Sequence, residues 1–231
     1  MIARRKDYSK KEPSRGSHKI YIVCEGTGTE PGYFRFFDGL SSNLQIITIP
    51  PENGTDPVKL MELAQMVFFG DNRRYAVDYL QNDRVWFIID TDSWEKEGKI
   101  EPLRKFCDEL NSGISIQFDE VKSYPAWNVA QSNPSFEIWL YYHFYSEKPT
   151  DADVEKSITF KEFVHASIHG GFDFNTDQSR LSDAITNAES NFSVNTISNS
   201  PELYSTEMHI LGKEIYSFVK NDLAKLKNKL R

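Results

Sequence analysis

The feature that most constrains this sequence is a pair of short, wholly apolar runs, each of which ends at an acidic residue. Residues 20–24 (IYIVC) stop at Glu25, and residues 85–89 (VWFII) stop at Asp90. Hydrophobicity is continuous along both runs rather than alternating, which is typical of strands covered on both faces in a parallel sheet. The two runs therefore predict buried parallel strands with an acid at each C-terminal end.

Further strands alternate with helices along the first 145 residues. Two more runs with strand character lie at 44–49 and 127–130. Helical patterns fall between and after the strands, at 30–37, 57–68, 100–110 and 135–145. Such alternation predicts an α/β fold with a parallel sheet, in which the loops after the strands form the ligand crevice. Residues 112–126 fit either a strand or a helix end, and both alternatives stay open.

Composition divides the chain into three expected parts. Residues 1–19 are basic and almost without apolar side chains, so they predict a flexible tail. Residues 20–148 form the expected core domain, and residues 149–231 show helical patterns without strands, which predicts a helical C-terminal extension on or near the core. The tail either contacts phosphates or only solubilises the chain. Its candidate phosphate-binding residues are Arg4, Arg5, Lys6, Lys10 and Lys11.

Charge and composition exclude several classes of protein. A net charge of −7 argues against a protein that coats nucleic acid through bulk positive charge. A nuclease is not excluded, because a bound cation can recruit phosphate. No apolar run approaches the roughly eighteen residues that a membrane helix needs, and the N-terminus lacks the apolar stretch of a signal peptide. Two isolated cysteines fit a reducing compartment, so a cytoplasmic location is expected.

Acidic residues at strand ends are the candidate functional groups. Glu25 follows the first apolar run, and Asp90 and Asp92 follow the strongest one. These positions face the crevice of a parallel sheet, where two aspartates in an Asp-x-Asp pattern can point at one spot. Hard cations such as Mg²⁺ take one or two carboxylates together with water and substrate phosphate. A nearby glutamate can transfer protons or serve as a further ligand.

At these residues the sequence resembles a known family. IYIVCEGTGTEPGYF and VWFIIDTDSW resemble the two motifs of Toprim domains, and the chain resembles RloB-like proteins of bacteria more narrowly. The segments that carry the narrower resemblance are RRKDYSKKEPSR, CEGTGTEPGYF, DTDSW and SNPSFEIWLYYHF, with a weaker likeness at STEMHILGKEI.

The resemblance implies a Toprim-like core over residues 20–148 and a place in phage-defence or mobile-element loci, often beside a partner ATPase. It implies that Glu25 is the catalytic acid or base, and that Asp90 and Asp92 hold Mg²⁺ or Mn²⁺. Glu30 is similar to a second metal-binding glutamate of related nucleases, although it stands one position later in the loop than that residue does.

Other residues have a functional and a structural interpretation. Glu137 is either a further acid in the crevice or a first-turn glutamate that suits the helix dipole. Asn133 is interpreted as a helix N-cap. The loop Gly26-Thr27-Gly28-Thr29 lacks the ending of a Walker A motif, which argues against an NTPase, but it could present backbone amides to a phosphate.

The sequence thus predicts a Mg²⁺- or Mn²⁺-dependent phosphodiesterase, a nuclease, that acts on nucleic acid. The alternative is a Toprim-like binding module that senses a ligand and regulates a partner ATPase without cutting. The choice between DNA and RNA, and self-association into a homo-oligomer, are left open.

Overall fold

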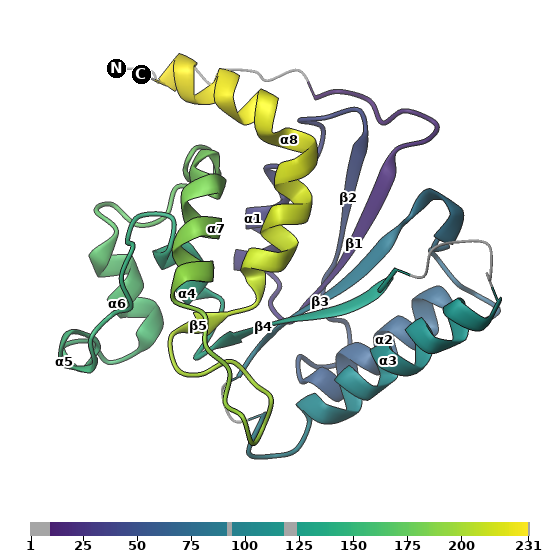
Figure 1. Ribbon diagram of the computed structural model, residues 1–231, viewed down its shortest axis with the longest axis horizontal. Helices are drawn as coiled ribbons and strands as arrows, with labels where there is room; N and C mark the ends of the chain where they lie inside the picture. The colour runs from purple at the N-terminus through teal and green to yellow at the C-terminus, as the bar shows by residue number, and fades with distance from the viewer. Residues whose placement is uncertain (1–9, 92–93, 118–123, 231) are drawn as a thin grey trace.

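The fold is an α/β sandwich built on one sheet, seen in a computed structural model that describes residues 10–91, 94–117 and 124–230 (Figure 1). The sheet has five strands in the order β2-β1-β3-β4-β5. β1 to β4 are parallel, and β5 is antiparallel to β4. The strands are β1 (His18–Cys24), β2 (Leu44–Ile49), β3 (Arg84–Asp90), β4 (Trp127–Asn133) and β5 (Ser205–Thr206).

Helices cover both faces of this sheet, as the α/β prediction requires. The α-helices are α1 (Thr29–Arg35), α2 (Pro57–Phe68), α3 (Ile100–Gln117), α4 (Glu137–Tyr141), α5 (Asp151–Val154), α6 (Phe160–Ser167), α7 (Leu181–Ser190) and α8 (Met208–Leu230). Two short 3-10 helices, Tyr79–Gln81 and Asp177–Arg180, precede β3 and α7. The predicted fold class, a parallel sheet flanked by helices with a helical C-terminal part, is confirmed.

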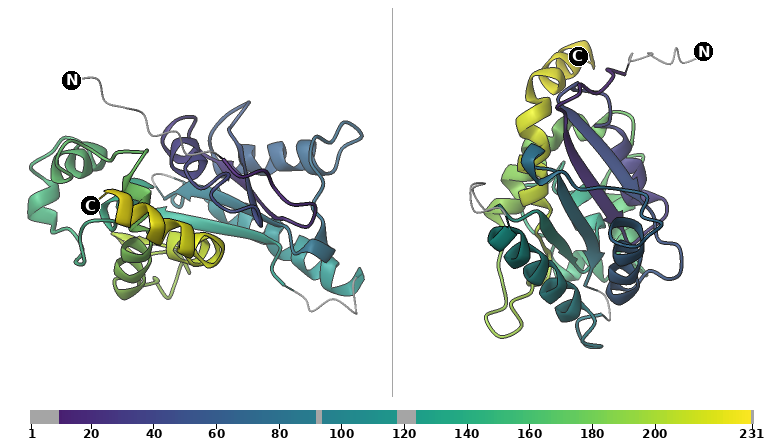
Figure 2. Two further views of the ribbon diagram at one scale, coloured as in Figure 1. Left: turned by 90° about the horizontal axis from the view of Figure 1, so that it is seen from above. Right: turned by 90° about the vertical axis from the view of Figure 1, so that its right-hand side faces the viewer.

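The strands alternate their side chains between two hydrophobic clusters. Tyr21 and Phe87 point to the face that α2 and α3 cover. Ile22 and Ile88 point to the opposite face, which packs against α1, α4, α7 and α8. Figure 2 shows the sheet between these helix layers, with α5 and α6 set to one side. The C-terminal helices are therefore part of the same core as the sheet.

Local sequence explains where several elements begin. Pro57 occupies the first turn of α2, where the missing N–H costs nothing, and the Asp56 carboxylate accepts hydrogen bonds from the amides of Val58 and Lys59. α3 extends to Gln117, so the part of segment 112–126 up to that residue is the end of a helix. Residues 118–123 lie outside the described residues.

Two expectations are wrong. Strand patterns do not stop near residue 150, because β5 pairs with β4 through Ser132 and Thr206. This strand has two residues, too few to leave a periodic pattern in the sequence. Asn133 is not the N-cap of the following helix: it ends β4, and its side-chain amide donates to the Pro201 carbonyl at 2.8 Å.

The described part of the basic tail lies against the fold. The amide of Lys11 donates to the Gly39 carbonyl at 2.8 Å, and β1 begins at His18, before the expected boundary at residue 20. The Lys10 and Lys11 ammonium groups form ion pairs with Asp38 and Asp222 at 2.8 and 2.9 Å. Arg4, Arg5 and Lys6 lie outside the described residues. Phosphate binding by the tail stays a prediction, as does the division at residues 20 and 149.

None of the helices among the described residues combines the length and the apolar character that crossing a membrane requires.

Candidate functional site

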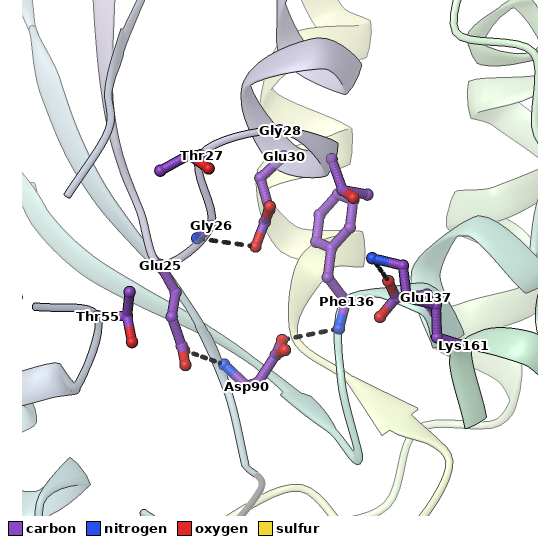
Figure 3. A pocket seen from close by; sticks show the side chains of 11 residues that line it. Glu25, Gly26, Thr27, Gly28, Glu30, Thr55, Asp90, Phe136, Glu137 and Lys161 are labelled. Atoms are coloured by element: carbon purple, nitrogen blue, oxygen red, sulfur yellow. Dashed lines mark hydrogen bonds and ion pairs between the residues drawn. The ribbon is translucent and has the colours of Figure 1, made fainter. Parts of the chain in front are cut away.

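An open cavity of about 470 Å³ lies at the C-terminal edge of the parallel strands. The loop after β1, the end of β3 and the start of α4 form most of its wall, and Figure 3 shows their side chains around it. Four of the eleven lining residues are acidic, and the cavity lies where α/β folds bind their ligands, outside the carboxyl ends of the strands. The lining residues are Glu25, Gly26, Thr27, Gly28, Thr29, Glu30, Thr55, Asp90, Phe136, Glu137 and Lys161.

Strand register brings Glu25 and Asp90 together. Cys24 pairs with Ile88, so the residue after β1 lies beside the last residues of β3. The Asp90 amide donates to Glu25 Oε2 at 2.8 Å, and the Trp94 indole donates to Glu25 Oε1 at 2.7 Å (Figure 3 shows the first of these bonds). Glu25 is 8% exposed, so these two donors fix the orientation of a nearly buried carboxylate.

Asp90 is held in turn by the beginning of α4. Its Oδ1 accepts a hydrogen bond from the Phe136 amide at 2.7 Å. Phe136 is the N-cap residue of α4, and its side chain makes no capping bond. The Asp90 carboxylate therefore takes the capping role that the sequence assigned to Asn133, because unpaired amides at a helix start need an acceptor. A long-range contact of this kind leaves no local sequence pattern.

Glu30 and Glu137 form a second acidic part of the cavity wall. Glu30 Oε1 accepts from the Gly26 amide at 3.2 Å, and Glu137 Oε2 accepts from the Ser135 hydroxyl at 2.7 Å. Both side chains are nearly buried. Burial raises the pKa of the Glu30 carboxyl, and the charge of Glu137 raises it further, against the lowering effects of hydrogen bonds to backbone amides and of Lys161.

Lys161 is a site residue that the sequence analysis missed. It lies on α6, in the helical C-terminal part, and its ammonium approaches Glu137 Oε1 at 3.3 Å. The side chain is 69% exposed, so it can turn toward a ligand in the cavity. Nothing in the local sequence marks this lysine, since a lysine on an amphipathic helix is ordinary. Packing of α6 against α4 brings it to the acids.

The cavity therefore brings together Glu25, Glu30, Asp90 and Glu137 of the predicted metal ligands. Asp92 lies outside the described residues. The donor set suits a hard cation, since carboxylate oxygen is the ligand that Mg²⁺ and Mn²⁺ prefer. Within the described ranges, however, no group of three or more His, Cys, Asp or Glu residues has the closeness of a complete metal site. The metal roles of these residues stay predictions.

Fold and site together define an α/β protein with an acidic crevice at the C-terminal edge of a parallel sheet. A family model described as RloB-like protein matches residues 20–215, which include the site and most of the C-terminal helices. The chain therefore belongs to the RloB-like protein family. Neither the comparison with curated proteins nor that with solved structures found a match.

Proposed function

We propose that this chain is a Mg²⁺- or Mn²⁺-dependent phosphodiesterase of the Toprim class that cuts nucleic acid. The observation that carries the proposal is the contact between Glu25 and Asp90, joined at 2.8 Å through the Asp90 amide on the wall of an open cavity. Structural carboxylates are usually buried beside cations, whereas acids that face one cavity together are typical of sites that bind a metal or move protons.

The surroundings of each acid support a role for it. Asp90 would hold the cation, together with Asp92, which follows it in the DTD motif. A bound divalent cation would supply Lewis-acid polarisation of a phosphate oxygen. Glu25, fixed by the Asp90 amide and the Trp94 indole, would transfer a proton to or from the attacking or leaving oxygen. Glu30 and Glu137 would add negative charge that draws a cation into the cavity.

The rest of the wall suits a phosphate. Lys161 supplies an ammonium donor that can leave Glu137 for a phosphate oxygen, and the loop of residues 26–29 lies across the cavity from it (Figure 3). Backbone amides in glycine-containing loops bind phosphates in other proteins. These groups support a phosphodiester substrate.

The experiment is a cleavage assay on the full chain. Purified protein is incubated with single- and double-stranded DNA and with structured RNA, in Mg²⁺, Mn²⁺ or EDTA. We expect metal-dependent cleavage of at least one substrate. Glu25→Gln should lower its rate by roughly 100-fold or more, because Gln keeps the shape but cannot exchange a proton. Asp90→Asn should also lose activity, and added Mn²⁺ should partly restore it.

The matched control is Glu214→Gln. Glu214 lies on α8 and binds Arg84 of β3 at 2.8 Å, at the other end of the strands. This variant should cut like the wild type. Equal cleavage by Glu25→Gln and the wild type would contradict the role of Glu25. If the wild type cuts none of the substrates, even with a partner ATPase present, the proposal that this chain is an enzyme would be overturned.

A second candidate is a non-cleaving binding module that regulates a partner ATPase. The observation that favours it is that both oxygens of Glu25 accept hydrogen bonds from the chain itself, as those of a purely structural carboxylate would. The module would bind a nucleic acid or nucleotide in the same cavity. Binding without cleavage, abolished by Lys161→Ala and retained in Glu25→Gln, would favour this candidate.

A further inference from the structure

A buried polar network contacts Thr91, the residue that follows β3. Its centre is Gln131, a β4 residue with no exposed surface. The Gln131 side-chain amide donates to the Thr91 hydroxyl at 2.9 Å, and its oxygen accepts from Arg104 Nη2 at 2.9 Å. Polar groups at this depth are costly unless their hydrogen bonds are complete. Both ends of the Gln131 side-chain amide have a partner, so its orientation is defined, whereas Arg104 Nε is buried without a hydrogen-bond partner among the described residues.

Arg104 sets the direction in which the Gln131 amide points. A guanidinium can only donate, so the Gln131 oxygen must face Arg104 and the NH₂ group must face Thr91. Arg104 is itself fixed by Glu207, whose Oε2 accepts from Arg104 Nη2 at 2.7 Å and from the backbone N–H of Gln131 at 2.9 Å. Glu207 lies between β5 and α8, in the C-terminal part of the chain.

Thr91 connects the network to the acidic site through hydrogen bonds. Its hydroxyl accepts from Gln131 and donates to the Ser132 carbonyl at 3.0 Å, and its amide donates to the same carbonyl at 2.8 Å. The Trp94 amide then donates to the Thr91 carbonyl at 3.0 Å, and the Trp94 indole donates to Glu25 at 2.7 Å. Asp90 and Asp92 flank Thr91 in the sequence.

We propose that Glu207, Arg104 and Gln131 are positioning residues, which hold Thr91 and thereby place Trp94 and Asp90 at the cavity. The C-terminal part of the chain then has a defined role, because it supplies the carboxylate that orients the network. The functional meaning of this placement rests on the proposed metal-dependent activity, but the placement itself can be measured without metal or substrate.

A second carboxylate on the same segment provides a matched control. Glu214 of α8 forms an ion pair with Arg84, 2.8 Å from its Nε, and accepts hydrogen bonds from the Trp86 indole at 3.0 Å and from His18 at 3.0 Å. Like Glu207 it joins the C-terminal segment to an arginine and to a strand. Its contacts are at the start of β1 and β3, away from the cavity, and its indole partner is Trp86 rather than Trp94.

The experiment uses the full chain labelled with 5-fluorotryptophan. The four tryptophans give four fluorine resonances, and single Trp→Phe variants assign those of Trp94 and Trp86. Without metal, Glu207→Gln should shift the Trp94 resonance and leave that of Trp86 in place. Glu214→Gln should do the reverse. A folded Glu207→Gln variant whose Trp94 resonance is unchanged would overturn the proposal.

A second pair of variants covers the case in which Glu207→Gln does not fold. Thr91→Val keeps the side-chain shape without the hydroxyl and should move the Trp94 resonance. Thr91→Ser restores the hydroxyl and should return the resonance to the wild-type position. If Thr91→Val leaves Trp94 unmoved, Thr91 does not carry the placement and the proposal fails.

A Mn²⁺ titration of the same samples separates this proposal from the proposed function. Mn²⁺ bound at the cavity should broaden the Trp94 resonance, and Glu207→Gln should weaken this binding roughly tenfold, as residues that orient metal ligands commonly do. If the wild type binds no Mn²⁺, the proposed metal-dependent activity is contradicted. The positioning proposal is then tested by the shift of the Trp94 resonance measured without metal. Equal Mn²⁺ affinity in wild type and Glu207→Gln would count against the positioning role.

Discussion

The two aspartates that bracket β3 have opposite surroundings. Asp83, directly before the strand, has no exposed surface, and its two oxygens accept from the amides of Lys19 and Asp78, each at 3.0 Å. The Lys19 ammonium lies 3.5 Å from the same carboxylate. Asp90, the last residue of the strand, is partly exposed on a cavity wall that also carries Glu25, Glu30 and Glu137.

The difference separates a structural acid from a candidate functional one. A buried carboxylate with two amides and a cation has its charge compensated inside the protein, so it can be kept for the fold alone. Acids that share a cavity repel one another when ionised, and this cost persists in folded proteins mainly where function requires it. One strand thus has an acid compensated within the fold at its start and an acid that shares a cavity with other acids at its end.

The largest expected effect is a difference in stability between two variants. Both carry an Asp→Asn substitution, one directly before β3 and the other at its end. Asp83→Asn should lower the free energy of unfolding by about 3 kcal/mol, because its NH₂ group would face a backbone N–H and the ion pair between the buried carboxylate and the partly exposed Lys19 would be lost. Asp90→Asn should cost less than about 1 kcal/mol, because it keeps an acceptor for the Phe136 amide and removes a charge from the cavity. Urea denaturation at neutral pH measures both.

Equal losses of unfolding free energy at the two positions would contradict the comparison, because Asp90 would then contribute as much to stability as Asp83 does. Asp108→Asn, on the exposed face of α3, is the control. Asp108 is neither a buried carboxylate with a paired cation nor an acid on the cavity wall.

A smaller effect is expected at Glu30. Its folded-state pKa lies above the unfolded value of about 4.5, so the folded protein binds this proton more readily. The resulting destabilisation is absent below the unfolded pKa and grows as the pH rises through the folded pKa. Glu30→Gln removes the charge and keeps an acceptor for the Gly26 amide, so it should raise the melting temperature relative to wild type at pH 7 more than at pH 4.

The control for the pH comparison is Glu109→Gln, since the Glu109 side chain is 67% exposed. A melting temperature of Glu30→Gln that falls equally below wild type at both pH values would show that the Glu30 charge costs the fold nothing.

The sequence predicted the features of the fold that depend on neighbouring residues. Continuous apolar runs predicted β1 and β3, because buried parallel strands need such side chains on both faces. Parallel topology then placed Glu25 and Asp90 at one edge, and the structure has both on one cavity wall. The helical pattern predicted at 57–68 has the same bounds as α2, whose start depends on capping contacts within a few residues.

The features that the sequence did not predict depend on contacts between residues far apart in the chain. Lys161 reaches Glu137 because α6 packs on α4, and Glu207 reaches Gln131 across 76 positions of sequence. Asp90 replaces Asn133 as the acceptor at the start of α4 for the same reason. Neither periodicity nor local motif contains such information, so these residues could be assigned only from the folded chain.

The central claim is that the acids around Glu25 and Asp90 bind a divalent cation, and a Mn²⁺ titration followed by electron paramagnetic resonance tests it most directly. The account predicts that the wild-type chain binds Mn²⁺, that Asp90→Asn weakens the binding at least about tenfold, and that Glu214→Gln leaves it unchanged. A folded wild type that binds no Mn²⁺ at millimolar concentration, or an Asp90→Asn variant that binds as tightly as wild type, would contradict the account.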